Sequence, residues 1–315
     1  MKTALVTGGG GFIGSHIVRG LLDKGWTVRV IDDLSGCGSW RRLENLKVDA
    51  MQIALSDLPN KRTILRGVDV IFHLAARVSV PESVKNPLDY HQVDATDTLN
   101  LVESARQENV RRVVYASTSA IYGELPEQPK RESHRGLPIS PYGVAKYAGE
   151  LYLGAYARLH GMQNISLRYF NVFGEGQDPK SQYGAAIPSI VCKIVTGERP
   201  IIYGDGEQTR DFCHVSNVVR ANLLAAEMPN LQGEAVNVAC GKRVSVNRIV
   251  ERANELLKKD VKPIYEPPRA GDVRDSLADI SEAKRVLGYE PAVQFDEGLK
   301  RSIDWYVRHL AQKTA

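Results

Sequence analysis

A cluster of glycines directly after the first apolar run constrains this chain more than any other feature. The residues TGGGGFIG, 7–14, follow a β-branched run at 4–7 and open a segment of helical periodicity near Phe12. Gly9, Gly11 and Gly14 fit the spacing G-x-G-x-x-G, while Gly8, Gly11 and Gly14 fit G-x-x-G-x-x-G, so the sequence leaves both registers open. A strand, a glycine turn and a helix in this order predict a site where the backbone closely approaches a pyrophosphate.

An acidic residue supports the same interpretation. Asp32 ends the second β-branched run 18 residues after Gly14, close to the ~20 expected for an acid that binds the adenosine ribose. Since a carboxylate there repels a 2′-phosphate, NAD is favoured over NADP. A simple strand-ending turn at Asp32 and Asp33 is the alternative. Arg41 and Arg42 are a caution, because a nearby Arg accommodates a 2′-phosphate.

The rhythm of the first half predicts the fold class. Helical patterns separate β-branched runs at 4–7, 27–31, 68–74, 112–117 and 165–170. This alternation is typical of an α/β fold with a Rossmann, doubly wound parallel sheet, and the apolar run at 112–117 suits an interior strand. Gly, Gln, Asp, Pro and Ser crowd residues 174–184. We therefore expect an NAD-binding domain over 1–175 and a smaller mixed α/β substrate-binding lobe over 176–315, interleaved and with approximate boundaries.

Composition excludes several classes of protein. The 315 residues carry a formal net charge of only +4 and no block of Lys or Arg, which argues against nucleic acid or anionic lipid as a partner. Neither a secretory signal nor an apolar run of membrane-spanning length is present in this sequence. The four cysteines are scattered without a C-x-x-C motif, so we expect reduced, mostly buried thiols in a cytoplasmic protein.

A tyrosine and a lysine at helical spacing are the candidate catalytic pair. Ser140 and Pro141 predict a helix start, with the helix running to about His160, so Tyr142 and Lys146 lie on one face. The pKa of a tyrosine, ~10, must fall by ~3 units before the phenol acts as a base at neutral pH. Lys146 at roughly 7 Å supplies ~2.4 kcal/mol in a dielectric of ~20, so a second positive charge, such as oxidised nicotinamide, is needed. A surface Tyr and a solvated Lys are the alternative.

The neighbouring strand end strengthens the catalytic interpretation. Ser117, Thr118 and Ser119 follow the interior run, at the edge where open parallel sheets bind their ligands. A hydroxyl there can orient the oxygen of a substrate and steady its proton. The residues HLAA at 73–76, ASTSAIYGE at 116–124, SPYGVAK at 140–146, LRYFNVFGEGQDP at 167–179, GDGEQTRDFCHV at 204–215 and PRAGDVRDSLADI at 268–280 complete the set of motifs.

With these motifs, the chain resembles the extended short-chain dehydrogenases/reductases, specifically the NAD-dependent nucleotide-sugar 4-epimerases, over essentially its whole length. The resemblance implies Tyr142 as catalytic base, Lys146 as its partner and Thr118 as the catalytic hydroxyl. The NAD-binding residues implied by motif and resemblance are Gly8, Gly11, Phe12, Ile13, Gly14, Asp32, Asp57, Leu58, Leu74, Ala75, Ala76, Ser117, Tyr142, Lys146 and Tyr169. The substrate-binding residues implied are Ser79, Thr118, Ser119, Tyr142, Asn171, Ala186, Tyr203, Arg210, Arg269, Asp272 and Ser276.

Three of these residues are assigned to the diphosphate of the substrate. The resemblance places Asn171, Arg210 and Arg269 there, and two guanidinium groups suit a diphosphate because they pair with it through two hydrogen bonds. Surface ion pairs with Asp211 and Asp272 are the alternative for the two arginines. We expect His73 and His214 to be packing residues rather than bases. No metal site is implied.

The resemblance also implies the reaction. In such enzymes the Tyr takes the proton of the sugar 4-hydroxyl, C4 passes a hydride to NAD, and the 4-keto sugar turns and takes the hydride back. A 4,6-dehydratase needs an acid pair after the catalytic Thr, whereas Ser119 and Ala120 follow Thr118. Epimerases restricted to non-acetylated hexoses carry a large Tyr at the position of Ser276. A small residue there favours interconversion of UDP-GlcNAc and UDP-GalNAc, as in the bacterial UDP-N-acetylglucosamine 4-epimerases, and leaves UDP-Glc and UDP-Gal open as further substrates.

Departures from the pattern keep alternatives open. Asp94 and Asp97 stand where the family usually has Asn and Gly, and Ala185 and Ala186 occupy a region where some relatives contact uridine with Asn. The alternatives are a hexose-only UDP-glucose 4-epimerase, a UDP-glucuronate decarboxylase and, outside enzymes, an NAD-sensing scaffold. The resemblance further implies a homodimer formed by a helix ending near Gln107 and the helix that carries Tyr142.

Overall fold

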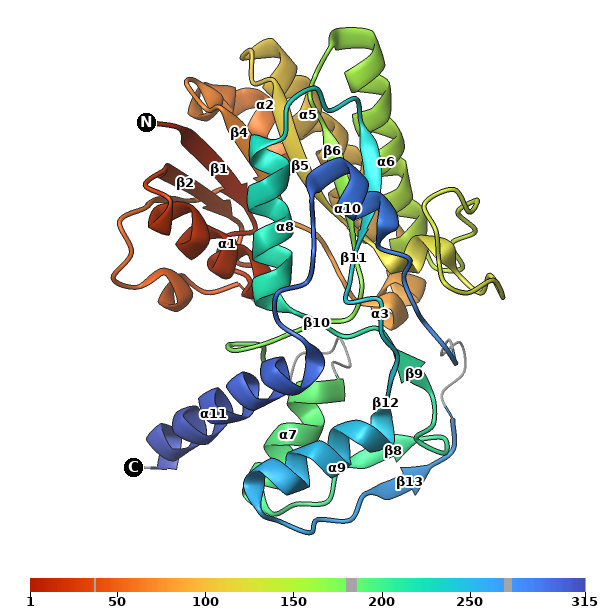
Figure 1. Cartoon of the computed structure of the whole chain (residues 1–315). Helices are drawn as coiled ribbons and strands as arrows, with labels where there is room; N and C mark the ends of the chain where they lie inside the picture. The colour runs from red at the N-terminus through yellow and green to blue at the C-terminus, as the bar shows by residue number, and fades with distance from the viewer. Residues whose placement is uncertain (37, 180–185, 269–273, 315) are drawn as a thin grey trace.

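One parallel sheet is the centre of the molecule. The computed structural model describes residues 1–36, 38–179, 186–268 and 274–314. Seven strands lie in the order β11-β6-β5-β4-β1-β2-β3 (Figure 1). They are β1 (Thr3–Thr7), β2 (Thr27–Asp32), β3 (Asp49–Gln52), β4 (Val70–His73), β5 (Arg112–Thr118), β6 (Ile165–Tyr169) and β11 (Glu234–Val238). All neighbours pair in parallel, which confirms the predicted doubly wound α/β fold.

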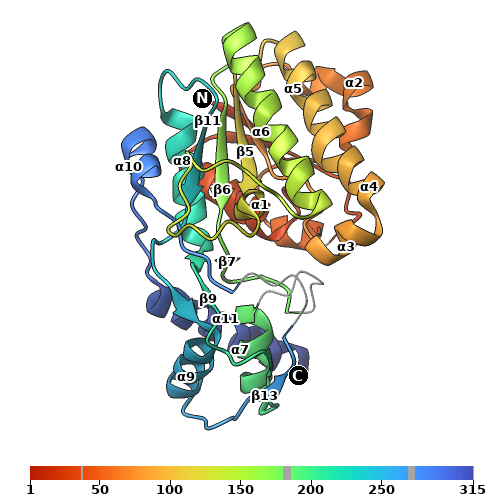
Figure 2. The same ribbon diagram turned by 90° about the vertical axis from the view of Figure 1, so that its right-hand side faces the viewer.

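Helices cover both faces of the sheet, as the continuous apolar runs of its interior strands require. On one face lie α1 (Phe12–Asp23), α8 (Val215–Glu227) and α10 (Ser281–Leu287), and on the other α2 (Leu58–Lys61), α5 (Asp97–Gln107) and α6 (Pro141–His160) (Figure 2). Each face has its own apolar core, one between the sheet and α1 and α8, the other between the sheet and α5 and α6. Both predicted helices near Phe12 and Pro141 are confirmed.

Short elements at the carboxyl edge of the sheet position the side chains described below. They are α3 (Val80–Lys85), α4 (Pro87–His91), a π-helical turn at Gln92–Thr96 and 3₁₀ turns at Trp40–Leu43, Leu55–Asp57 and Ser119–Tyr122. A further 3₁₀ turn, at Arg62–Leu65, leads into the start of β4. Ser140 caps α6 by accepting a hydrogen bond from Gly143 N, and Ser79 caps α3 by accepting one from Glu82 N. These caps fix the residues at which the two helices begin, beside the cavity described below.

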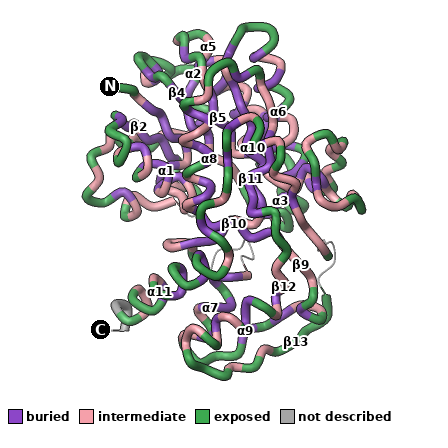
Figure 3. Tube along the Cα trace, in the orientation of Figure 1, coloured by how far each residue is buried: buried purple, intermediate pink, exposed green. Residues whose placement is uncertain are grey.

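A smaller lobe lies beyond the carboxyl edge of the sheet. Its helices α7 (Ala186–Thr196), α9 (Val246–Leu257) and α11 (Phe295–Thr314) enclose a third apolar core. Its strands pair as β8 (Ile201–Tyr203) with β13 (Ile264–Glu266) and β9 (Thr209–Arg210) with β12 (Val244–Ser245), and β7 (Val172–Phe173) pairs with β10 (Cys213–His214) between the lobes. Figure 3 shows buried segments inside each lobe and exposed ones along the outer helices.

Two elements that follow residue 175 belong to the larger lobe. The helix α8 covers the sheet and β11 extends it beside β6. The residues after the expected boundary at 175/176 are therefore shared between the two lobes. Of the cysteines the structure describes, Cys213 and Cys240 are buried and Cys192 is half-buried, all as free thiols, while Cys37 lies outside the described residues. None of the helices in the described ranges is both long and apolar enough to cross a membrane.

Candidate active site

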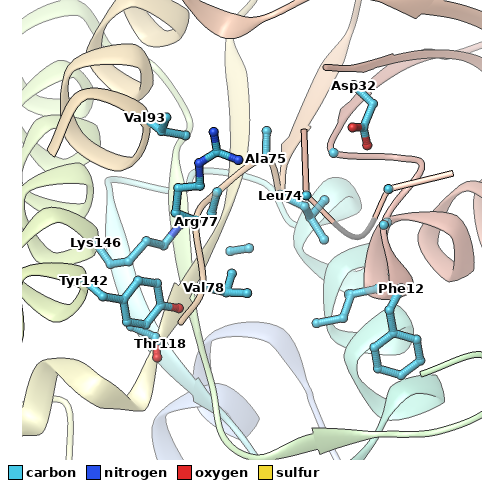
Figure 4. Close-up of a pocket in the computed structure, with 18 of the residues that line it drawn as sticks. Phe12, Asp32, Leu74, Ala75, Arg77, Val78, Val93, Thr118, Tyr142 and Lys146 are labelled. Carbon is cyan, nitrogen blue, oxygen red and sulfur yellow. The ribbon is translucent and has the colours of Figure 1, made fainter. Parts of the chain in front are cut away.

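A cavity of about 710 Å³ opens at the carboxyl edge of the sheet. Its lining comes from the ends of β1, β2, β4, β5 and β6, from α6 and from the loop after β7. Figure 4 shows Phe12 and Asp32 on one side and Thr118, Tyr142 and Lys146 on the other. We call these the dinucleotide end (Gly8, Gly11, Phe12, Gly14, Asp32) and the catalytic end (Thr118, Tyr142, Lys146). The two motifs that are far apart in the sequence thus share one cavity.

The glycine turn forms the floor of the dinucleotide end. Gly8 has a φ of +68°, and a Cβ there would lie 2.7 Å from Ala75 N. A Cβ on Gly14 would lie 2.2 Å from Gly8 O. Gly8, Gly11 and Gly14 line the cavity whereas Gly9, which packs on Val30, does not. The geometry therefore favours the register G-x-x-G-x-x-G.

The start of α1 offers a place for a phosphate. Gly11 is its N-cap residue and provides no side-chain cap for the first N–H groups of the helix, and the first turn lines the cavity. A helix N-terminus over a turn that no Cβ obstructs fits the pyrophosphate of a dinucleotide. Phe12 and Ile13, the next residues, also line the cavity.

Asp32 lies at the end of β2 with both carboxylate oxygens engaged by the backbone. Its Oδ2 accepts from Gly10 N and its Oδ1 from Leu34 N, each at 2.9 Å. Burial raises the pKa of this carboxyl, and the two backbone N–H groups oppose that shift. Arg42 also lines the cavity and donates to Gly10 O at 3.2 Å. The caution about a 2′-phosphate therefore falls on Arg42, since Arg41 is exposed.

The middle of the cavity is bordered by Leu74, Ala75 and Ala76 in the loop after β4, and their contact with the cofactor stays a prediction. Thr7 Oγ1 accepts from Leu74 N and Ala75 N, both at 3.1 Å, and this fixes the loop against β1. The lining near β3 is formed by residues 53–56. The next two residues face elsewhere: Asp57 pairs with Lys61 and Leu58 is buried in the apolar core. Their assignment to adenine remains a prediction.

At the catalytic end, α6 brings Tyr142 and Lys146 to the cavity. Both side chains are buried, and Lys146 Nζ lies 4.1 Å from the centroid of the Tyr115 ring. Thr118 Oγ1 accepts a hydrogen bond from Ala120 N at 3.1 Å, which holds the hydroxyl at the mouth of the sheet. Burial lowers the pKa of Lys146, while Asp94 and Glu150 raise it. The arrangement brings a phenol, an ammonium and a hydroxyl to one point, as acid–base chemistry on an alcohol requires.

Ser117 belongs to a buried network that the sequence did not reveal. Its hydroxyl donates to Glu150 Oε1 at 2.5 Å, and Glu150 accepts two further bonds from Arg168, Nε at 2.9 Å and Nη2 at 2.7 Å. Arg168 also donates to the Tyr122 hydroxyl at 2.9 Å. An arginine within an apolar strand could have signalled this pair, because a buried charge requires a partner.

The predicted substrate residues divide into two groups. Ser119 and Asn171 line the cavity beside Thr118, as does Tyr169, which was predicted to bind the cofactor. Those outside the lining are Ser79, whose hydroxyl caps α3, Ala186 at the start of α7, Tyr203 on β8, Arg210 on β9 and Ser276, whose N–H donates to Thr209 O at 3.1 Å. Arg269, Asp272 and Ala185 lie outside the described residues.

Both histidines that we expected to pack are buried. The two ring nitrogens of His73 form hydrogen bonds, Nδ1 with Thr7 Oγ1 at 2.8 Å and Nε2 with Thr98 Oγ1 at 2.9 Å. Burial lowers the pKa of this imidazole. His214 packs edge-on against Phe173, with ring centroids 5.4 Å apart. Asp211 does not need Arg210 as a partner, because its carboxylate accepts from Cys240 N, Gly241 N and Ala278 N.

Comparison with known proteins decides the family. The model of the NAD dependent epimerase/dehydratase family matches residues 4–239. The chain belongs to this family. A solved UDP-N-acetylglucosamine 4-epimerase from Methanobrevibacter ruminantium is 41% identical, with a TM-score of 0.93 over 98% of this chain and 99% of that one.

Other relatives act on other sugars. A UDP-glucose 4-epimerase from Thermotoga maritima, solved with UDP-glucose, is 39% identical with a TM-score of 0.93, over 98% and 99% of the two chains. A UDP-glucose 4-epimerase of Mycolicibacterium smegmatis is 35% identical over 97% of this chain and 98% of its own. The cofactor of this epimerase family is NAD, and the dinucleotide end described above fits it.

Proposed function

We propose that the protein is a UDP-sugar 4-epimerase, and so an isomerase, whose substrates are UDP-GlcNAc and UDP-GalNAc. The observation that carries the proposal is the meeting of Tyr142, Lys146 and Thr118 at one end of a cavity whose other end is the glycine turn. Family membership and the 4-epimerases among its relatives support the reaction. The small residue Ser276, seven positions after Arg269 in a stretch that resembles the UDP-N-acetylglucosamine 4-epimerases, supports the sugar.

The chain's own residues divide the work of proton transfer. The Tyr142 phenolate takes the proton of the sugar 4-hydroxyl and later returns it, while Thr118 donates or accepts at the same oxygen and keeps it in place. The Lys146 ammonium stabilises the phenolate, and its burial makes that attraction stronger than it would be in water. NAD, when bound, supplies the hydride acceptor and donor for C4. Because the hydride returns to the same carbon, no net oxidation occurs.

A parallel NMR assay tests the reaction and the sugar together. The purified protein is incubated separately with UDP-GlcNAc, UDP-Glc and UDP-GlcA, and we expect the galacto epimer to form from UDP-GlcNAc. A pentose product or carbon dioxide from UDP-GlcA would indicate the decarboxylase instead, and turnover of UDP-Glc alone the hexose-only epimerase. Tyr142→Phe should lower kcat by about 10²–10⁴. Wild-type inversion by this variant would contradict the proposed base.

The choice of sugar has its own variant. Ser276 is half-buried beside β9, and its side chain is much smaller than the tyrosine of the hexose-only epimerases. Ser276→Tyr should abolish turnover of UDP-GlcNAc and UDP-GalNAc while retaining activity on UDP-Glc or UDP-Gal. Ser276→Ala is the matched control, because it changes the chemistry of the side chain with little change in volume. Unchanged UDP-GalNAc turnover by Ser276→Tyr would remove the gatekeeper role.

Assembly as a homodimer is also part of the proposal. Along α6, Val144, Leu151 and Leu159 are 52%, 58% and 75% exposed, and their spacing places them on one face of the helix. An apolar stripe of this kind suits the same stripe of a second copy. We expect Leu151→Glu to shift the mass measured by light scattering to that of a monomer, whereas Val307→Glu, an exposed position on α11, should not.

A further inference from the structure

The segment that follows β7 lies between the two lobes and forms neither a helix nor a strand. We call residues 175–178 the strap. Two of them, Gln177 and Asp178, line the cavity. Because the strap belongs to no helix or sheet, its backbone groups need hydrogen-bond partners of another kind. The side chains that supply these partners show what holds the strap in place.

Three consecutive carbonyl groups of the strap each accept a hydrogen bond from the side chain of a different element. The three bonds are those from His16 Nε2 to Glu175 O at 2.8 Å, from Arg42 Nη2 to Gly176 O at 3.4 Å and from the Tyr306 hydroxyl to Gln177 O at 2.6 Å. The first donor lies on α1, the second in the 3₁₀ turn Trp40–Leu43 and the third on α11. The strap is therefore tied to the larger lobe at two points and to the smaller lobe at one.

The two donors of the larger lobe lie at the dinucleotide end of the cavity. Arg42 Nη1 also donates to Gly10 O at 3.2 Å, so one guanidinium joins the strap to the glycine turn. His16 lies one helical turn after Phe12, and the two rings meet edge-on with centroids 5.5 Å apart (Figure 4 shows Phe12). Burial lowers the pKa of His16, and a neutral imidazole still donates from one ring nitrogen. The strap thus lies beside the turn that fits the pyrophosphate of NAD.

Two buried side chains outside the larger lobe hold the strap as well. Tyr306 is 1% exposed and belongs to the apolar core of the smaller lobe. Burial raises the pKa of its phenol, so the hydroxyl keeps its proton and donates to the strap. On β10, between the lobes, His214 Nε2 lies 3.0 Å from Glu175 Oε2. Neither Tyr306 nor His214 is among the described residues that line the cavity, so both act on it through the strap.

We propose that the smaller lobe takes part in retaining NAD, with Tyr306 as a positioning residue that acts through the strap. The bond from Tyr306 fixes Gln177, which lines the cavity, and Arg42 connects the same strap to the glycine turn. A segment held at several points opens less often, so NAD leaves the cavity more slowly. The inference goes beyond the proposed function, because it concerns the cofactor of the family and holds whichever sugar is the substrate.

A purely structural role for these bonds makes a different prediction. Each of them also satisfies a carbonyl group of an irregular segment, which stabilises the fold by itself. If that were their whole effect, removing one donor would lower the melting temperature and leave the release of NAD unchanged. The rate of NAD release therefore distinguishes retention from stability.

The test is the exchange of bound NAD for isotopically labelled NAD. The NAD-loaded protein is mixed with an excess of labelled NAD, and the label that stays with the protein after gel filtration is measured against time. Tyr306→Phe removes one hydroxyl and one tie, and we expect it to exchange NAD about five- to tenfold faster than wild type. His16→Phe, which removes the donor to Glu175 O and keeps a ring beside Phe12, should also accelerate exchange.

Tyr289→Phe is the matched control. Tyr289 is a buried phenol whose hydroxyl donates to a backbone carbonyl, Ala239 O, at 2.9 Å. Neither of these two residues is among those described as lining the cavity. We expect the melting temperatures of Tyr289→Phe and Tyr306→Phe to fall by similar amounts, while NAD exchange by Tyr289→Phe stays within about twofold of wild type.

Exchange by Tyr306→Phe at the wild-type rate would overturn the inference. An equal acceleration in Tyr289→Phe would overturn it too, because it would indicate a general loosening of the fold. If Tyr306→Phe does not fold, His16→Phe gives the same test from the other lobe. The assay contains no UDP-sugar, so a failure of the strap to retain NAD and a failure of the proposed function appear in different experiments.

Discussion

The two ends of the cavity are formed by different kinds of group. At the dinucleotide end, backbone atoms do the work: a turn of glycines, uncapped N–H groups of α1, and an Asp32 whose oxygens accept from Gly10 N and Leu34 N. At the catalytic end, buried charged side chains from distant elements gather, namely Lys146 on α6 and the Glu150–Arg168 ion pair that joins α6 to β6. The first end depends on local shape and the second on the balance of charge.

The largest effect should come from breaking the charge balance. Glu150→Ala leaves the Arg168 guanidinium buried without its carboxylate, and we expect it to lower the free energy of unfolding by about 3–5 kcal/mol. Denaturant titration of wild type and variant measures this difference. A decrease of less than about 1 kcal/mol in the free energy of unfolding would mean that the buried ion pair does not stabilise the catalytic end. The two ends of the cavity would then not differ in the way described.

A smaller effect should come from altering the shape of the glycine turn. In Gly14→Ala the new Cβ would lie 2.2 Å from Gly8 O, so the turn must shift. We expect a loss of about 1–3 kcal/mol in stability and at least a tenfold weaker affinity for NAD, measured by calorimetry. Gly154→Ala is the control, since its Cβ in mid-helix would meet nothing closer than Arg158 Nη1 at 3.3 Å and alanine favours a helix by up to about 1 kcal/mol. Equal NAD affinity in both variants would show that the turn tolerates a side chain.

The smallest effect should come from a charge pair outside the cavity. Glu103 and Arg106 lie 2.7 Å apart on α5 with side chains 34% and 38% exposed. Arg106 lowers the pKa of Glu103 to about 2, yet solvent screens such a pair, and we expect Glu103→Gln to cost about 1 kcal/mol or less. Denaturation under the conditions used for Glu150→Ala sharpens the contrast between exposed and buried pairs, and equal losses would contradict it.

The sequence predicted those parts of the site that are local along the chain. The glycine turn, Asp32 and the pair on α6 each follow from a motif of a few residues, and the structure brings them to one cavity. The roles assigned to individual residues remain predictions. The Glu150–Arg168 pair and its bond from Ser117 depend on contacts between segments far apart in the sequence, so spacing could not reveal them.

Two strands of the sheet escaped prediction for related reasons. The strand β3, with the sequence DAMQ, is mostly exposed at one edge, and it lacks the apolar run or alternation that marks a strand. The strand β11 has an ordinary strand pattern, but it follows the segment 176–233, in which the chain first enters the smaller lobe. That it pairs with β6 depends on how distant parts of the chain are arranged, and the local sequence pattern does not predict this arrangement.

The return of the chain to β11 has a consequence for anyone who divides this protein. A fragment ending at residue 175 would lack β11, so β6 would become an exposed edge strand. Its unpaired N–H and C=O groups and its apolar side chains could then pair with a strand of another molecule. Such a fragment should precipitate on expression instead of yielding a miniature nucleotide-binding module. The passage of the chain through the smaller lobe is therefore what brings β11 to cover this edge.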